Sequence, residues 1–230
     1  MKAMILAAGR GERMRPLTDT APKPLLEIAG KPLIIWHIEN LVRAGIHELV
    51  INHAHLGAQI EKALGDGSQL DASIQYSPEV KALETAGGIT NALPLLGEKI
   101  FAVINGDIFC DYDFSQLQQH ATAMKLNDDA AHLVLVENPK HHPIGDFGLQ
   151  QQRITNNPPK FTFSGIGIYQ PSLFANIPHG STAQLAPLLQ AQIDLDKVSG
   201  EIFKDLWVDV GTPQRLTELD MQMRTLHNMP

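Results

Sequence analysis

The sequence has little of several features that define other protein classes. It holds a single cysteine, Cys110, which excludes an intramolecular disulfide and a cysteine-based zinc cluster and fits a reducing compartment such as the cytoplasm. No apolar run reaches the roughly 18 residues of a membrane span. Lys and Arg number 18 against 25 Asp and Glu, a net charge of −7, whereas nucleic-acid binding needs a basic face. We therefore expect neither a membrane nor a nucleic acid as partner.

The composition that remains is that of one globular domain. Hydrophobic residues make up 43% of the 230 residues and charged residues 19%, which is enough to bury a core. Apolar runs at 3–8, 49–52, 100–105 and 130–136 alternate with helix-period segments at 33–44, 60–64 and 114–124, the last capped by Asp113. This alternation predicts an α/β, Rossmann-like fold, with a mostly parallel sheet flanked by helices.

The texture of the sequence changes after residue 137. Prolines and glycines interrupt short polar segments up to the alternating stretch 161–169, so we expect a small lobe over the sheet at about 138–180. A short strand at 206–210 and a helix after Pro213 return to the earlier pattern. We expect residues 1–230 to form a single domain that includes this lobe.

Positive charge gathers in the first segment of an otherwise acidic chain. Residues 1–31 carry six basic side chains against three acidic ones, and the segment is rich in glycine. A short basic loop in an acidic protein suggests a pocket for a small polyanion such as a nucleoside triphosphate. A merely solvated loop is the alternative.

Two glycines follow the first predicted strand directly. Ala8, Gly9 and Gly11 lie where the backbone of an open α/β sheet approaches a ligand, and N–H groups there are suited to phosphate oxygens. A dinucleotide-binding fingerprint fails because residue 14 is Met14, and a P-loop fails because Gly30-Lys31 is followed by proline. A simple tight turn is the alternative at this point.

A lysine between two prolines follows this loop. Pro22-Lys23-Pro24 places a mobile positive charge on a stiffened backbone, which suits a phosphate. With G-x-G-x-R at 9–13, followed by P-K-P-L at 22–25, the sequence resembles the sugar-1-phosphate nucleotidylyltransferases. The resemblance implies the nucleotide-diphospho-sugar transferase type of fold, and it implies that Arg13 and Lys23 hold the triphosphate and neutralise charge at the α-phosphate as catalytic residues.

Two aspartates end predicted strands far apart in the sequence. Asp107 follows the apolar run 100–105, and Asp209 lies in the segment W-V-D-V-G-T-P. Either residue alone fits a cap or turn, but together they provide the carboxylates that Mg²⁺ takes alongside phosphate oxygens. The resemblance implies that both bind Mg²⁺ and that Asp107 is catalytic. A histidine-based metal site, drawn from His53, His55, His141 and His142, is a weaker alternative because no H-E-x-x-H motif is present.

The remaining motifs of the resemblance concern the binding of the nucleobase and of the sugar. The stretch L-E-T-A-G-G at 83–88 opens a predicted helix, and the resemblance implies that Gly87 lies against the nucleobase. For the sugar it implies Asn105, Gly145 and Ser164, the last two from the lobe. Many relatives carry E-K-P, with a lysine that grips the sugar phosphate, where this chain has Asn-Asn-Pro at 156–158; Lys160 is a candidate replacement.

Taken together, the resemblance predicts a Mg²⁺-dependent enzyme that transfers a uridylyl group from UTP to a sugar 1-phosphate. Transfer of another nucleotide, as in mannose-1-phosphate guanylyltransferases or cytidylyltransferases, is an alternative within the family. A non-catalytic nucleotide sensor is an alternative from another class, although such a sensor has no need of both aspartates. The residues leave the oligomeric state, the number of metal ions and the identity of the sugar open.

Overall fold

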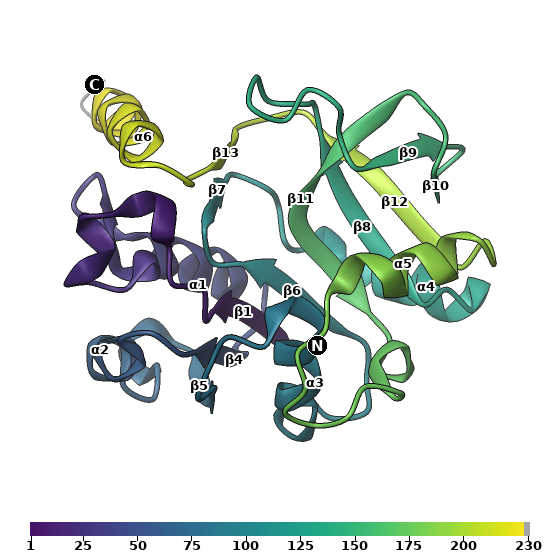
Figure 1. Ribbon diagram of the computed structural model, residues 1–230, viewed down its shortest axis with the longest axis horizontal. Helices are drawn as coiled ribbons and strands as arrows, with labels where there is room; N and C mark the ends of the chain where they lie inside the picture. Colours follow the sequence, from purple (N-terminus) through teal and green to yellow (C-terminus); the bar gives the residue numbers. More distant parts are fainter. Residues whose placement is uncertain (228–230) are drawn as a thin grey trace.

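A computed structural model describes residues 1–227 of the chain, so that residues 228–230 of the expected domain lie outside the described part. Within the described residues, a nine-stranded sheet crosses the molecule (Figure 1). Its strands, in spatial order, are β5 (Ser73–Pro78), β4 (Glu48–His53), β1 (Ala3–Ala7), β6 (Phe101–Asn105), β11 (Lys160–Tyr169), β8 (Ala131–Val136), β12 (Val198–Phe203), β10 (Arg153–Thr155) and β9 (Phe147–Gln150). The expected α/β class is confirmed.

The sheet is parallel where the site lies and mixed beyond it. β5, β4, β1 and β6 are parallel neighbours, whereas β11 runs antiparallel to both β6 and β8. The prediction of a parallel sheet therefore holds for the strands β5, β4, β1 and β6 and for the pair formed by β8 and β12. Antiparallel pairing returns in β9 and β10, which the short polar segments after residue 137 form at the far edge of the sheet.

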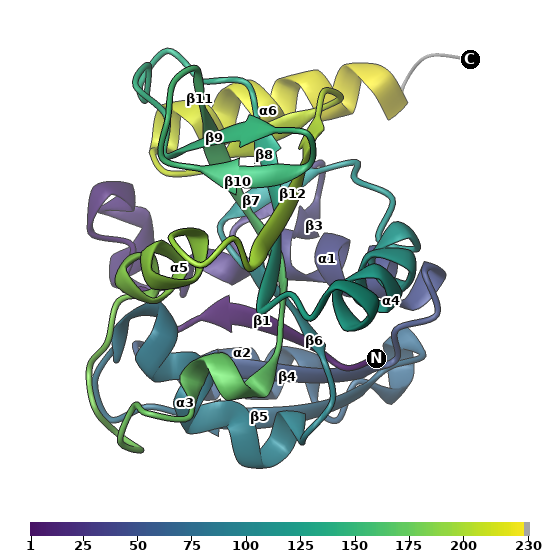
Figure 2. The ribbon, with the colours of Figure 1, turned by 90° about the vertical axis from the view of Figure 1, so that its right-hand side faces the viewer.

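Helices cover both faces of the sheet because the strands are apolar on both sides. In β1, Ala3, Ile5 and Ala7 face one core and Met4 faces the other. The first core is closed by α1 (Leu33–Arg43), α2 (Gly57–Leu64) and α4 (Gln116–Asn127). The second core is closed by α3 (Glu84–Leu96) and α5 (Leu185–Ile193), so that α4 and α5 flank opposite sides of β8 and β12 (Figure 2).

Two short ribbons and the last helix complete the fold. β7 (Ile108–Cys110) pairs with β13 (Trp207–Asp209), and β2 (Glu27–Ile28) pairs with β3 (Lys31–Pro32). The helix α6 (Pro213–His227) packs through Leu219 and Met223 against a third apolar cluster that includes Ile28 and Val210. The chain thereby brings its first 32 residues and its last helix together.

The predicted runs lie within a few residues of β1, β4, β6, β8, β11 and β13, while β5, β7, β12 and α5 were not predicted and one cap was wrong. The prediction that Asp113 caps a helix starting at residue 114 is wrong: α4 begins at Gln116, and Asp113 instead accepts a hydrogen bond from the Ser115 N–H at 3.0 Å. The local side-chain bond therefore forms a turn ahead of the helix.

Among residues 1–227, every helix falls short of the length and apolar character that crossing a membrane requires.

Candidate active site

The sheet topology places a crevice at the carboxyl end of β1. The chain runs from β1 to β4 and β5 on one side, and then returns to β6 on the other side of β1. Ligands of open α/β sheets bind where the strand order reverses in this way, because the two connections diverge and leave the strand ends uncovered. The loops after β1, β5 and β6 all begin at this edge.

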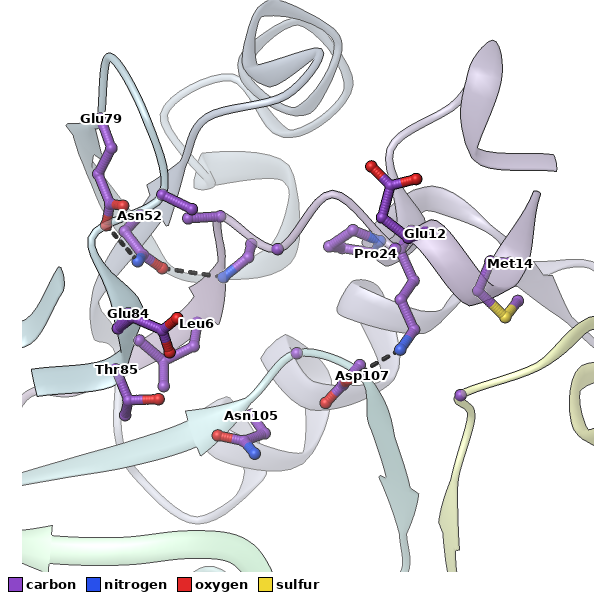
Figure 3. A pocket seen from close by; sticks show the side chains of 18 of the residues that line it. Leu6, Glu12, Met14, Pro24, Asn52, Glu79, Glu84, Thr85, Asn105 and Asp107 are labelled. Carbon is purple, nitrogen blue, oxygen red and sulfur yellow. Dashed lines mark hydrogen bonds and ion pairs between the residues drawn. The ribbon is translucent and has the colours of Figure 1, made fainter. Parts of the chain in front are cut away.

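A cavity of about 420 Å³ opens there. It is lined by the loop after β1, the segment entering α3 and the turn after β6. Of the predicted site residues, it brings together Ala8, Gly9, Gly11, Arg13, Lys23, Asn105 and Asp107. Figure 3 shows Asn52 and Glu79 on one side of this pocket and Asp107 on the other. The cavity thus joins the basic loop to one of the two predicted metal ligands.

Glycine occupies positions 9 and 11 of the loop for two different structural reasons. Gly11 has a φ of +69°, and an added Cβ would lie 3.0 Å from Cγ2 of Thr18, whose hydroxyl donates to the Gly11 carbonyl at 2.8 Å. A side chain at Gly9 would meet nothing within 4 Å. Gly11 is therefore needed to form the loop, while Gly9 leaves the cavity wall open.

Lys23 and Asp107 form an ion pair on the cavity wall. Lys23 Nζ lies 2.7 Å from Asp107 Oδ2, and the lysine side chain is only 8% exposed while that of Asp107 is 42% exposed. Because a buried ammonium needs a charged partner, the pair fixes the cation at the cavity. The lysine between prolines reaches this position from the short 3₁₀ helix Lys23–Leu25.

Asp209 lies beside this pair but does not line the cavity. β13 pairs with β7 so that Asp209 stands opposite Ile108, and the Val210 N–H donates to the Asp107 carbonyl at 2.9 Å. Arg215 Nη1 approaches Asp209 Oδ2 at 2.6 Å, and His141 Nε2 approaches the same oxygen at 3.2 Å. Both predicted metal carboxylates therefore carry cationic partners in this structure.

A buried pair that the sequence did not predict shapes the opposite wall of the cavity. Asn52 Oδ1 accepts from the Ala7 N–H at 2.9 Å, and Asn52 Nδ2 donates to Glu79 Oε1 at 2.6 Å. Glu79 Oε2 accepts from the Leu83 N–H at 2.9 Å. The pair thereby ties the end of β1 to the start of α3. Its signal in the sequence was the polar Asn52 at the end of the apolar run 49–52, whereas Glu79 follows the mostly polar strand β5 and gave no such signal.

A buried histidine supports the turn that holds Asp107. His37 of α1 donates from Nε2 to the Ile108 carbonyl at 2.8 Å, since a carbonyl only accepts. Burial lowers the pKa of His37 to about 4, against weaker opposing effects of the Ile108 bond and the Asp107 charge. The ring is therefore neutral at pH 7 and serves as a fixed donor.

Besides Asp209, three further predicted site residues do not line the cavity. Gly87 packs α3 against the 181–183 segment, where an added Cβ would lie 2.3 Å from the Ser181 carbonyl oxygen. Ser164 is buried in β11 and accepts the Trp207 indole N–H on its carbonyl at 2.9 Å. Gly145 has a φ of +69° in the loop before β9. The cavity wall near α3 is instead formed by residues 82–85.

The histidines of the alternative metal site lie apart with separate partners. His53 pairs with Glu61 at 2.7 Å, and His55 Nε2 lies 3.0 Å from the Thr18 carbonyl. His142 pairs with Asp146 at 3.0 Å. The four residues therefore do not converge on one point.

A cavity of this kind suits a nucleotide whose phosphates meet cations beside carboxylates. The chain belongs to the nucleotidyl transferase family, whose model matches residues 2–225. It is 56% identical over 223 residues, 95% of this chain and 96% of the other, to the N-acetylmuramate alpha-1-phosphate uridylyltransferase of Neisseria meningitidis serogroup B.

The chain also resembles a longer relative and a solved structure at lower sequence identity. The chain is 31% identical to the mannose-1-phosphate guanylyltransferase of Mycobacterium tuberculosis, over 92% of this chain and 61% of that protein. The crystal structure of a putative glucose-1-phosphate thymidylyltransferase from Bacillus anthracis, in complex with a sucrose, superimposes with a TM-score of 0.85 at 21% identity, over 100% of this chain and 96% of that one. That likeness confirms the nucleotide-sugar transferase fold.

Proposed function

We propose that this chain transfers a uridylyl group from UTP to N-acetylmuramate α-1-phosphate, giving UDP-N-acetylmuramate and pyrophosphate. The observation that carries the proposal is the cavity in which the glycine loop, Arg13 and Lys23 meet Asp107. The choice of nucleotide and sugar is supported by the 56% identity to the Neisseria uridylyltransferase, over nearly the full length of both chains. Mannose-1-phosphate guanylyl transfer is the second candidate, supported by relatives at about 30% identity.

The reaction needs positioning and charge neutralisation more than acid–base chemistry. An oxygen of the sugar phosphate forms a bond to the α-phosphorus of UTP, and the bond from that phosphorus to the bridging oxygen breaks, so its electron pair leaves on pyrophosphate. The attacking phosphate is already ionised at neutral pH. Arg13 and Lys23 would bind the triphosphate and stabilise the charge that develops in the transition state. Lys23 would exchange Asp107 for phosphate oxygens as UTP binds.

No covalent intermediate is required. The one cysteine, Cys110, is buried, and burial raises the pKa of its thiol to about 12, so it is not a thiolate at neutral pH. Transfer therefore proceeds directly between the two substrates.

The donor set of the site fits Mg²⁺. Asp107 supplies carboxylate oxygens from the turn before β7, and Asp209 supplies them from β13, the partner strand of β7. Mg²⁺ prefers one or two carboxylates together with phosphate oxygens. These two residues would hold the ion, which when bound neutralises phosphate charge. Lys23 and Arg215, which now pair with the carboxylates, would be released toward other anions.

The sugar side of the proposal rests on the segment 138–180 acting as a lobe within one domain. Asn138 holds the lobe loop by donating from Nδ2 to the Lys160 carbonyl at 2.9 Å and accepting from Thr162 Oγ1 at 2.9 Å. Asn105 would face the sugar from the cavity, with Gly145 and Ser164 contributing from the lobe. We assign Gly87 to packing beneath the nucleobase wall.

The cellular setting follows from the cysteine content and the substrates. A single buried cysteine fits a reducing compartment, and a sugar 1-phosphate of N-acetylmuramate would come from breakdown of peptidoglycan. We therefore place the enzyme in the cytoplasm and in the recycling of peptidoglycan.

A substrate matrix tests the proposed function. Purified protein with Mg²⁺ is given UTP, GTP, CTP or dTTP in combination with the 1-phosphates of N-acetylmuramate, N-acetylglucosamine, glucose and mannose, and pyrophosphate release is measured. We expect turnover to be highest with UTP and N-acetylmuramate α-1-phosphate. Highest turnover with another pair would keep the mechanism and move the substrate, and UTP binding without any turnover would identify a sensor.

A further inference from the structure

Three polar side chains occupy positions that the fold otherwise reserves for apolar residues. On α4, Leu117, Ala121 and Met124 are buried against the sheet, and His120 lies on the same stripe at helical spacing. On β8, His132 alternates with the core residue Val134 and therefore points to the same face.

β12 adds a carboxylate to this face. Glu201 stands beside Val134 in the parallel ladder, and Ser199 stands beside His132. In-register neighbours of a parallel pair project to one side of the sheet, which here is the side that α4 covers (Figure 2). His120, His132 and Glu201 consequently meet between α4 and the sheet, on elements that contribute no residue to the cavity.

The distances match those between the ligands of a single metal ion. Glu201 Oε1 lies 3.1 Å from His120 Nε2 and 3.8 Å from His132 Nε2, and all three ligand atoms lie within 4.8 Å of one another. A tetrahedral zinc ion with bonds of about 2 Å holds its ligand atoms roughly 3.3 Å apart. The two imidazole rings are stacked with centroids 4.1 Å apart, so small ring rotations reach that spacing.

Both histidines present a buried nitrogen that lacks a hydrogen bond. His120 Nε2 is close to Glu201 but outside hydrogen-bond geometry, and His132 Nε2 is too distant from it. The His132 side chain is 94% buried, since only 6% of it is exposed. A buried polar atom without a partner costs about 1 to 3 kcal/mol, so this arrangement is unfavourable unless a further group completes it.

The surroundings favour the metal-binding form of the ligands. Burial is the largest of the effects that lower the pKa of His132, which leaves its ring neutral at pH 7. His132 Nδ1 lies 3.0 Å from Ser199 Oγ, which orients the ring with Nε2 toward Glu201. Burial raises the pKa of Glu201, but the approach of His120, His132 and Tyr112 prevails and holds it well below the usual range, so the carboxylate is ionised.

We propose that His120, His132 and Glu201 form a binding site for one divalent transition-metal ion, with zinc as the ion that this ligand set suits best. Two imidazoles and one carboxylate favour zinc and its neighbours over Mg²⁺, which prefers oxygen ligands alone. The side chains of His120 and Glu201 are 24% and 26% exposed, so the site lies near the surface, and a water molecule would supply the fourth ligand. The ion ties α4 to β8 and β12, and the site is separate from the proposed Mg²⁺ carboxylates.

Metal titration of the intact chain tests the site. Protein stripped with a chelator and dialysed is titrated with Co²⁺ and, separately, with Zn²⁺, in millimolar Mg²⁺ to occupy oxygen-only sites. We expect one equivalent to bind with the absorption of a four-coordinate Co²⁺ complex. A zinc concentration of 100 times the Kd should raise the Tm by about 5 to 10 °C, because the ion binds only the folded state.

Single substitutions identify the ligands. His120→Gln and Glu201→Gln should each weaken binding by at least about 10-fold, and Ser199→Ala should weaken it by about 10- to 100-fold, as loss of an orienting bond does. His179→Gln removes an exposed histidine and should bind like the wild type. Asp107→Asn should also keep this site while losing turnover.

The outcomes decide the proposal. His120 is partly exposed, so His120→Gln is expected to keep the fold, which circular dichroism checks. Saturable binding that weakens by at least about 10-fold in the two ligand variants supports the site. Binding of equal strength in every variant, or no saturable binding below about 100 µM metal, overturns it and leaves a hydrogen-bonded histidine pair.

Discussion

Lys23 shows at the scale of one residue how the site works. Its ammonium is held 2.7 Å from Asp107 at the wall of the cavity, and its stem is almost fully buried. Once Lys23 has passed from Asp107 to the phosphate oxygens of bound UTP, its buried stem would hold the cation in place while negative charge develops on the transferring phosphate. Charge that is already in position lowers the barrier.

Replacing this lysine should remove turnover without unfolding the chain. We expect Lys23→Ala to lower kcat by about 10²- to 10³-fold, the cost of one transition-state contact of roughly 3 to 4 kcal/mol. Lys31→Ala is the matched control, because Lys31 is also ion-paired, with Glu39, but does not line the cavity. Pyrophosphate release measures both. Near-normal turnover in Lys23→Ala would remove Lys23 from the mechanism.

Two neighbouring glycines should respond in opposite ways to the same substitution. Gly9→Ala is expected to leave the Tm unchanged, because the added methyl group meets no atom, but to raise the KM for UTP by narrowing the cavity. Gly11→Ala is expected to destabilise the fold by about 1 to 2 kcal/mol, because its φ of +69° is left-handed. Chemical denaturation and steady-state kinetics separate the two effects. A stability loss in Gly9→Ala would show that this loop closes more tightly than the structure indicates.

Residues carried by a short motif could be predicted, and those that depend on packing could not. Lys23 and Asp107 stood out because a proline pair and a strand end mark them locally. The Asn52–Glu79 pair and the His141–Asp209 pair join elements distant in sequence, and nothing local indicates their partners. Gly87 packs α3 against the 181–183 segment and lies outside the cavity lining, so its contact with the nucleobase stays a prediction.

At the scale of elements, α1 supports the turn from β6 into β7. His37 spans this junction with its bond to Ile108, one residue after Asp107. The short strand β7 was absent from the sequence prediction, because three residues give too little pattern to read. The parallel strands β1, β4, β6 and β8 were predictable from their apolar runs, whereas β5 and β12, with more polar residues, were not.

The buried histidine should make stability depend on acidity. The folded chain resists protonation of His37 down to pH about 4, whereas the unfolded chain binds the proton near 6.5, so acidification between these values favours unfolding. From pH 7 to pH 5 this group should cost about 2 kcal/mol of unfolding free energy. His37→Gln keeps a donor for the Ile108 carbonyl. On the same acidification its free energy of unfolding, measured by urea denaturation, should fall by about 2 kcal/mol less than that of the wild type.

A second histidine variant controls for this comparison. His47 is exposed, so its imidazole is hydrated in both folded and unfolded chains, and His47→Gln should follow the wild type. An identical pH dependence in the wild type and His37→Gln would rule out the assigned role of burial at His37.

At the scale of the whole molecule, one sheet edge gathers segments from both ends of the chain. The loop after β1, the β7–β13 ribbon and α6 meet through the Lys23–Asp107 and Arg215–Asp209 pairs. The fold class and the sheet edge that carries the candidate site could be predicted from the order of the apolar runs and from the motifs. The antiparallel direction of β11 could not. Its pairing with β6 depends on contacts between segments more than 50 residues apart.

Substrate and metal should stabilise this assembly together. Since UTP and Mg²⁺ bind only the folded chain, UTP at 100 times its Kd should raise the free energy of unfolding by about 2.7 kcal/mol. Removing Mg²⁺ with EDTA should abolish turnover and most of the shift in Tm. Asp209→Asn should reduce the Mg²⁺-dependent part of that shift, and full turnover in EDTA would show that the carboxylates serve another purpose.

A competition reaction tests the central claim most directly. UTP and GTP, with N-acetylmuramate α-1-phosphate and mannose 1-phosphate, are offered to the enzyme together in equal amounts with Mg²⁺, and the products are identified by mass spectrometry. The account predicts UDP-N-acetylmuramate as the dominant product. A dominant GDP-mannose, or no nucleotide sugar at all, would contradict it.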